Sequence, residues 1–307
     1  MAASQAASGG IFALSGAAGT PWSRRLADLI PLALVAIPAL FLLVAFVIPN
    51  AFLLSAGFYQ SDSQVLTDKL TLENYQLLLG RPLYRNMIYR SFWIGGLVGL
   101  LVVTIAYPLA FFLARTTSRW KGVLIALTFS PLLASVVVRT YGWWVLLNAD
   151  GAFNRFLRAL GWIDQSIAFL PSSGAIVLGL THSLLPYGVL TILSSLHGLN
   201  PNLERAASSL GAGRLRTFLE VTLPLSLPGV LGGFFLAFAL ALSAYATPQI
   251  LGGPATETMA TMIYKFMVPM AEWSLGSALS TILVVSAMTM LLIGGVLGAR
   301  SHQAVAS

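Results

Sequence analysis

Long stretches without a charged side chain divide this sequence. Such runs are near or above the ~20 residues that a helix needs to cross ~30 Å of hydrocarbon at ~1.5 Å per residue. They lie between Asp28 and Asp62, Arg90 and Arg115, Lys121 and Arg139, Asp164 and Glu204, Glu220 and Glu257, and Glu272 and Arg300. They predict membrane-spanning helices near residues 31–55, 91–114, 122–147, 174–196, 227–250 and 276–298.

The third predicted span is irregular because it contains Arg139. A charge in the middle of a span costs at least about 2.5 kcal/mol, although a long side chain near the end of a span can reach the interface. Arg139 therefore either snorkels or pairs inside the bundle, or it lines a transport path together with Tyr141. The sequence leaves both interpretations open.

Composition agrees with a membrane protein. The chain has 307 residues, of which 57% are hydrophobic and 9% are charged, whereas an ordinary soluble domain has about 25% charged residues. Because a soluble fold of this size cannot hide so much apolar surface, lipid must face much of it. We expect an all-α membrane protein with about six transmembrane helices.

Several kinds of chemistry are not expected. The chain has no cysteine, which excludes disulfides and thiol sites, and its three histidines lack metal-ligand spacing. The net charge of +7 is spread singly and in pairs, so nucleic-acid binding is not expected. We interpret His182 in the fourth span as a hydrogen-bond partner of a neighbouring helix.

The basic residues of the loops predict the orientation. On the side of the termini they lie directly against span ends, whereas those on the other side lie mostly in the long loop 56–90, and long loops count less. Both termini are therefore expected in the cytoplasm. Residues 1–25 are expected to be a disordered tail, 26–300 the transmembrane domain, and 301–307 a second tail.

The loop 197–226, between the fourth and fifth spans, has the clearest local pattern. Asn200 can cap a helix, Pro201 suits the first helical position, and Glu204 favours the positive end of the helix dipole. Gly211 follows where a left-handed residue can end the helix. One apolar stripe results, formed by Leu203, Ala206, Ala207 and Leu210. The stripe either packs on its own protein or docks on a separate soluble subunit.

This loop resembles the signature loop of permease subunits of binding-protein-dependent ABC importers. The family pattern is Glu-Ala-Ala, three residues, Gly, and later Leu-Pro. Arg205 stands where the family usually has Glu, and Glu204 lies one place earlier. The resemblance implies an ATPase-coupling loop made of Glu204, Arg205, Ala206, Ala207, Leu210, Gly211, Ala212, Phe218 and Pro224.

Other segments are similar to the spermidine/putrescine-type subgroup, whose members carry polyamines, opines, phosphonates and similar small polar solutes. They are ENYQLLL (73–79), YPLAFFLAR (107–115), SPLLASVVVRTYGWWVLL (130–147) and ATPQILGGP (246–254). The resemblance implies a fold like that of type I ABC importer permeases. It also implies a second permease subunit, two ABC ATPase subunits and an extracytoplasmic solute-binding protein.

The energy for transport is expected to come from other subunits rather than from this chain. The sequence has no glycine-rich phosphate loop followed by lysine, so we expect no ATPase activity and no bound cofactor in this chain. ATP and Mg²⁺ are expected on the partner ATPase subunits. The alternative is a stand-alone secondary carrier or channel, but no Asp or Glu falls in a predicted span to couple ions.

The fifth span suggests a second contact with the path. Pro248 is expected to interrupt its helix, and irregular backbone at that depth should face protein or a wet cavity. Tyr245, Thr247 and Gln249 are therefore candidates for a gate or a substrate contact. Hydrogen bonding near the outer membrane surface is the other interpretation.

Overall fold

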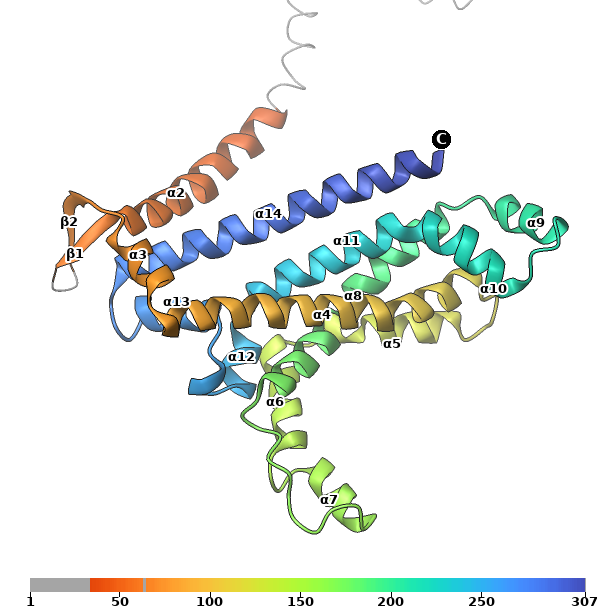
Figure 1. Ribbon diagram of the computed structural model, residues 1–307, viewed down its shortest axis with the longest axis horizontal. Helices are drawn as coiled ribbons and strands as arrows, with labels where there is room; N and C mark the ends of the chain where they lie inside the picture. Colours follow the sequence, from red (N-terminus) through yellow and green to blue (C-terminus); the bar gives the residue numbers. More distant parts are fainter. Residues whose placement is uncertain (1–33, 63–64, 307) are drawn as a thin grey trace, which may run out of the picture. The chain divides into compact units, whose positions relative to one another are not determined.

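The computed structural model describes residues 34–62 and 65–306 (Figure 1). The predicted tail of residues 1–25 lies outside these ranges. The chain divides into two units, residues 1–53 and 54–307. In the first unit, residues 34–42 are helical and are followed by a π-helical turn, η1 (Leu43–Val47), and by the start of α2 (Ile48–Ser55). These residues belong to the first candidate span, Leu34–Phe58.

The second unit begins with short elements that precede the long helices. A 3-10 turn, η2 (Ala56–Phe58), leads into an antiparallel hairpin of β1 (Tyr59–Asp62) and β2 (Val65–Leu70), and then into α3 (Glu73–Gly80). The side chain of Asn74 donates to the carbonyls of Gly57 and Tyr59 at 3.0 Å each. This amide therefore ties α3 to the residues that lead into the hairpin.

α4 (Pro82–Arg115) starts earlier than the span predicted at residues 91–114. Pro82 occupies the first turn, where its missing N–H is not needed. Arg85 and Arg90 are therefore helical rather than part of a loop. Charged residues mark where apolar sequence ends, but they do not end a helix.

α4, α8 (Ser173–His197) and α11 (Leu223–Leu242) pack together as the core of the unit. Glycines allow these helices to approach closely. A Cβ built on Gly188 of α8 would lie 2.5 Å from a methyl carbon of Val102, and one built on Gly233 of α11 would lie 2.6 Å from the hydroxyl of Thr191.

The predicted continuous helix 122–147 is divided in two, α5 (Lys121–Leu133) and α6 (Val136–Leu147). The chain bends by 99° between α5 and the segment Val136–Ala159, which begins with α6. Pro131 weakens the end of α5 because it cannot donate to the carbonyl of Leu127, which accepts from the Ser130 hydroxyl instead, at 2.9 Å. A short helix, α7 (Ala152–Ala159), follows α6.

The predicted fifth span, 227–250, is also shorter in the structure. α11 ends at Leu242, and α12 (Ala246–Leu251) begins after three residues that break the helix. The break therefore precedes Pro248 rather than falling on it. In a continuous helix Pro248 could not donate to the carbonyl of Ala244, whereas in the first turn of α12 no donor is needed.

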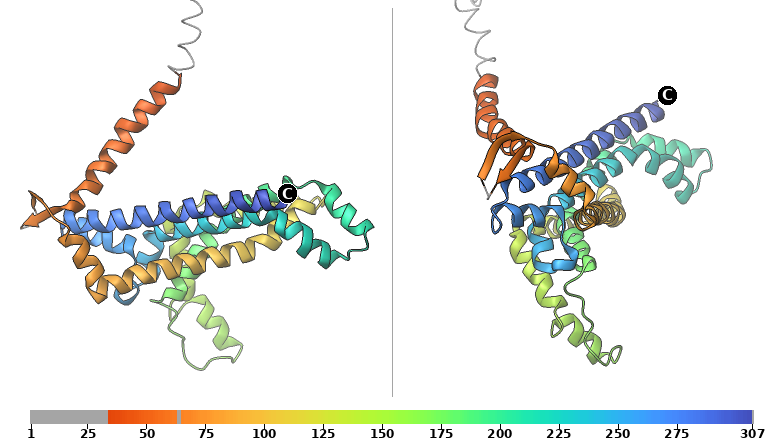
Figure 2. Two further views of the ribbon diagram at one scale, coloured as in Figure 1. Left: turned by 45° about the horizontal axis from the view of Figure 1, so that its top comes forward. Right: turned by 60° about the vertical axis from the view of Figure 1, so that its left-hand side comes forward.

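The rest of the unit completes the two ends of the bundle. α9 (Pro201–Ser209), α10 (Arg214–Thr217) and a π-helical turn, η3 (Phe218–Thr222), connect α8 to α11. After α12 come η4 (Pro254–Thr256), α13 (Met259–Met267) and α14 (Trp273–Ala306). Residues 301–306, predicted as part of a tail, thus continue α14. Figure 2 shows α14 and α4 running lengthwise with α11, which both contact.

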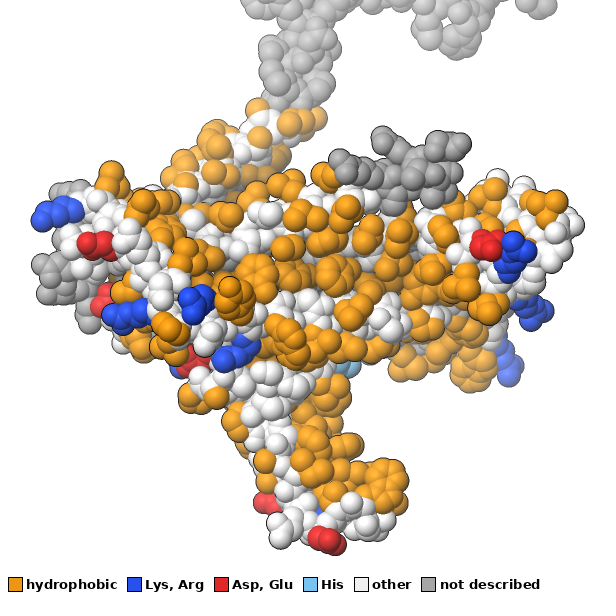
Figure 3. Space-filling model, viewed as in Figure 1, with side chains coloured by type: hydrophobic (Ala, Val, Ile, Leu, Met, Phe, Trp, Pro, Cys, Tyr) orange, Lys and Arg blue, Asp and Glu red, His pale blue; other side chains and the backbone are white. Residues whose placement is uncertain are grey.

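Five helices of the described residues are long and apolar enough to cross a membrane, and the bent pair that begins with α5 adds a sixth if it counts as one span. The predicted all-α membrane fold is therefore confirmed. Figure 3 shows apolar side chains along the sides of the helices and charged side chains gathered at their ends, as a lipid environment requires.

The core packing makes a prediction about two adjacent glycines of α11. Gly233 is buried against Thr191, whereas a Cβ on the exposed Gly232 would meet nothing within 4 Å. We expect Gly233→Leu to destabilise the purified chain in detergent by about 1–3 kcal/mol through overpacking, and Gly232→Leu to leave its thermal midpoint near that of the unmodified chain. Equal midpoints for the two variants would contradict this packing.

Candidate functional site

α9 begins as its sequence predicts. The side-chain oxygen of Asn200 accepts a hydrogen bond from the backbone N–H of Asn202 at 3.0 Å, and Pro201 occupies the first turn. These interactions satisfy or avoid the free donors that every helix start presents. The helix therefore has a defined first residue although it lies between two connecting segments.

α9 also ends as predicted, at Gly211 with a φ of +87°. The N–H of Ala212 donates to the carbonyl of Ala207 at 3.0 Å, and the N–H of Gly211 donates to that of Ser208 at 3.1 Å. This pair of bonds is the Schellman motif, which requires a left-handed residue and favours glycine. Both ends of α9 are thus determined by local sequence.

Glu204 connects α9 to the rest of the chain. Its carboxylate forms an ion pair with Arg115 at the end of α4 and accepts a hydrogen bond of 2.8 Å from the hydroxyl of Thr222 in η3. The side chains of Arg115 and Glu204 are only 31% and 29% exposed. The acid closest to the family's Glu position is therefore bonded within its own chain.

The remaining side chains of α9 divide into two faces. The side chains of Glu204 and Ala207 are half-buried and face the rest of the chain, whereas the side chains on the opposite face of α9 are exposed to solvent. With ~3.6 residues per turn, that opposite face consists of Asn202, Arg205, Ala206 and Ser209. Leu203 and Leu210 flank it, and Leu210 is 89% exposed. The predicted stripe is thus not covered by its own chain, except at Ala207.

Two other residues predicted for coupling pack inside the chain. The ring of Phe218 meets the rings of Tyr107 and Phe111 of α4 edge-on, with centroids 5.7 and 5.6 Å apart. Pro224 lies in the first turn of α11. Of the predicted set, the exposed residues are Arg205, Ala206, Leu210 and Gly211, and Ala212 is half-buried.

A second polar group forms where α6, α8 and α12 meet. The hydroxyls of Thr140 and Thr247 share a hydrogen bond of 3.1 Å in a buried position. The indole N–H of Trp143 donates to Nδ1 of His182 at 3.3 Å. The interpretation of His182 as a partner of a neighbouring helix is therefore confirmed. Trp143 belongs to this group although the sequence did not predict a contact with His182.

Arg139 lies on α6, directly before Thr140 of this group. Its Nε and Nη1 are buried and have no hydrogen-bond partner among the described residues. A guanidinium is always charged and needs acceptors when it leaves water. Two donors of this guanidinium are therefore unsatisfied within the described residues.

The other residues predicted for the path lie apart. Tyr141 is 54% exposed, and the ring of Tyr245 packs against that of Tyr264 of α13, with centroids 4.8 Å apart. Gln249 lines a cavity of about 290 Å³ beside the ion pair of Glu257 and Lys265. Thr247 is joined to the helix that contains Arg139 by its hydrogen bond to Thr140.

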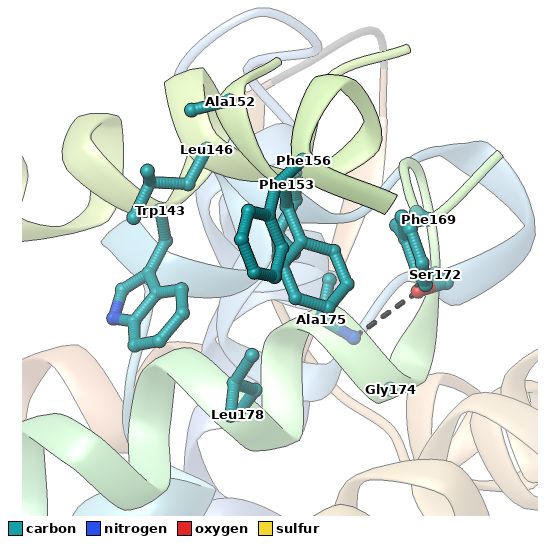
Figure 4. A pocket seen from close by; sticks show the side chains of 11 residues that line it. Trp143, Leu146, Ala152, Phe153, Phe156, Phe169, Ser172, Gly174, Ala175 and Leu178 are labelled. Atoms are coloured by element: carbon teal, nitrogen blue, oxygen red, sulfur yellow. Dashed lines mark hydrogen bonds between the residues drawn. The ribbon is translucent and has the colours of Figure 1, made fainter. Parts of the chain in front are cut away.

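A larger cavity of about 800 Å³ lies between α6, α7 and the start of α8. Figure 4 shows the rings of Phe153 and Phe156 of α7 pointing toward α8. The other residues that line this cavity are Trp143, Leu146, Leu147, Ala152, Phe169, Ser172, Gly174, Ala175 and Leu178. The Ser172 hydroxyl accepts from the N–H of Ala175 at 3.1 Å and so caps α8. This lining suits hydrocarbon rather than a polar solute.

Comparison with known proteins shows which family the chain belongs to. Residues 9–305 match the family described as the binding-protein-dependent transport system inner membrane component. The chain belongs to this family. It is a permease subunit of an ABC importer and a multi-pass component of a bacterial inner membrane, and in this family separate subunits hydrolyse ATP. The predicted resemblance to ABC importer permeases is confirmed.

Two relatives from Escherichia coli (strain K12) cover much of the chain. The spermidine/putrescine transport system permease protein PotB is 31% identical over 253 residues, which are 82% of this chain and 92% of that protein. The inner membrane ABC transporter permease protein YdcU is 34% identical over 227 residues, 69% of this chain and 72% of that protein. The permease is thus of the polyamine-transport type.

Solved structures support the fold. A chain of a bacterial ABC transporter involved in the import of the acidic polysaccharide alginate matches with a TM-score of 0.75 and 17% identity, covering 91% of this chain and 98% of that one. A chain of the MetNI methionine ABC transporter matches with a TM-score of 0.57 and 14% identity, covering 75% and 98%. At these identities the likeness concerns the fold alone.

Proposed function

We propose that this permease moves a small polar solute of the polyamine type into the cytoplasm, receiving it from an extracytoplasmic binding protein. It acts beside a second permease subunit, and the uncovered face of α9 docks on one of two ABC ATPase subunits. The observation that carries this proposal is α9 itself, a capped helix whose outward face has only small side chains around Arg205. Such a face allows close approach of a partner.

A docked helix transmits movement only if it is attached firmly to the helices that must move. The Glu204 carboxylate supplies this attachment, because it joins α9 to Arg115 at the end of α4 and to Thr222 just before α11. α4 and α11 also pack on each other in the core. A displacement of α9 by the ATPase is therefore passed to both helices at once.

This proposal also orients the chain. A loop that docks on an ATPase must be cytoplasmic, so the end of the bundle with α9 faces the cytoplasm, as do both termini. The basic residues at this end agree with that placement: Arg115, Arg119, Lys121, Arg205, Arg214 and Arg216. ATP and Mg²⁺ are bound by the ATPase subunits.

The solute path is proposed to follow the two broken segments. The breaks after α5 and after α11 leave irregular backbone, which a bilayer tolerates only beside protein or a wet cavity. The Thr140–Thr247 hydrogen bond joins the helices that follow these breaks. Arg139, with its free donors, provides hydrogen bonds to water along such a path. Tyr141, Tyr245 and Gln249 are secondary candidates.

The docking proposal predicts the effect of a single charge on α9. Ala206→Glu should leave membrane insertion intact but lower co-purification of the ATPase at least about tenfold, because the new carboxylate would be buried in the interface. Thr117→Glu is the matched control, since Thr117 is exposed in the turn between α4 and α5 at the same end. The measurement is subunit stoichiometry after gentle solubilisation of tagged chains.

An unmodified chain that purifies without an ATPase and transports its solute with an ion gradient in liposomes would contradict this function. Unchanged ATPase recovery with Ala206→Glu would contradict the assignment of α9 as the docking helix.

The path proposal predicts a separation of transport from assembly. Arg139→Ala should lower solute uptake by at least about tenfold, the effect of losing charged hydrogen bonds, while ATPase recovery stays unchanged. Val145→Ala, at an exposed position on the same helix, is the control. Uptake by Arg139→Ala equal to that of the control would exclude Arg139 from the path.

A further inference from the structure

The outward face of α9 has a charge at its centre. Glu204 and Ala207 point toward the chain, and the opposite direction on a helix of ~3.6 residues per turn falls between Arg205 and Ala206. Asn202 and Ser209 complete this face, and all four residues are exposed. Any partner that covers α9 from outside must therefore cover Arg205.

The guanidinium of Arg205 forms no ion pair with a carboxylate among the described residues. Among the described residues its guanidinium donates only to the side-chain oxygen of Asn202, at 3.4 Å. The two acids nearest in sequence are engaged elsewhere, Glu204 with Arg115 and Glu220 with Arg216. The positive charge of Arg205 is therefore balanced by solvent alone in the isolated chain.

Docking removes that solvent. Ala206 and Ser209 are too small to hold a partner away, so a surface packed on them also excludes water from the stem and head of Arg205. A buried guanidinium without an acceptor is strongly unfavourable. Its planar fork of N–H donors matches a carboxylate, which can accept two parallel bonds.

We propose that the ATPase surface that covers α9 presents an Asp or Glu carboxylate to Arg205. This inference rests on the proposed function and adds the chemistry of the partner. Anionic lipid headgroups are the competing explanation for a basic residue at this end. They suit Arg119 better, because its guanidinium lies 5.8 Å from the ring of Trp120 at the turn between α4 and α5, an arrangement typical of membrane interfaces.

The test compares three variants of the full chain in complex with the ATPase that co-purifies with the unmodified chain. Arg205→Glu should weaken ATPase binding at least about tenfold, the loss expected when like charges meet in a desolvated contact. Arg205→Lys should lose less because it keeps the charge. Arg119→Glu, the matched charge reversal, should stay within about twofold of the unmodified chain.

A suppressor selection identifies the partner residue. Substitutions in the ATPase that restore binding to Arg205→Glu should replace an Asp or Glu by Lys, Arg or a neutral residue on one surface. Unchanged binding by Arg205→Glu would overturn the inference, and so would an equal loss in Arg119→Glu, which would indicate headgroup or general electrostatic effects.

These outcomes separate the inference from the proposed function. If Ala206→Glu abolishes binding but Arg205→Glu does not, α9 is the docking helix and only the carboxylate is wrong. If neither substitution changes binding, the docking function of α9 is wrong as well.

Discussion

The position of α9 against the helical core depends on one carboxylate, that of Glu204. A helix of nine residues is marginal by itself in water, and α9 has no other ion pair among the described residues that fixes it to the bundle. Through Arg115 and Thr222 the carboxylate joins α9 to the ends of two core helices. Glu204 therefore holds α9 on its own chain, and the charged residue on the outward face of α9 is Arg205.

The second constraint is the bilayer, which forbids unsatisfied backbone in contact with lipid. The chain breaks after α5 and after α11, and the helices that follow the two breaks meet at the hydroxyls of Thr140 and Thr247. Trp143 and His182 form a second hydrogen bond on α6 and α8, and we propose that the solute path passes along these broken segments. The packed core of α4, α8 and α11 and the broken segments thus have separate places in the fold.

Local features of the structure could be predicted from sequence because they follow from nearest neighbours. The charge-free runs predict the helices, and Asn200 and Gly211 mark both ends of α9. The contacts that give α9 its orientation could not be predicted from the sequence, because Glu204 and Arg115 lie 89 residues apart. For the same reason the sequence suggested Phe218 as a partner contact, although it packs on α4. The bend before α6 has no glycine or proline at residues 134–135 to announce it.

If Glu204 transmits the movement of a docked α9 to α4 and α11, its loss should separate ATP hydrolysis from transport. Complexes with Glu204→Ala are reconstituted in liposomes, and solute uptake per ATP hydrolysed is compared with that of Glu220→Ala, whose ion pair is largely exposed. We expect Glu204→Ala to assemble and hydrolyse ATP while uptake per ATP falls at least about tenfold, because a charged contact is lost. Glu220→Ala should remain coupled. Equal coupling in the two variants would contradict this role of Glu204.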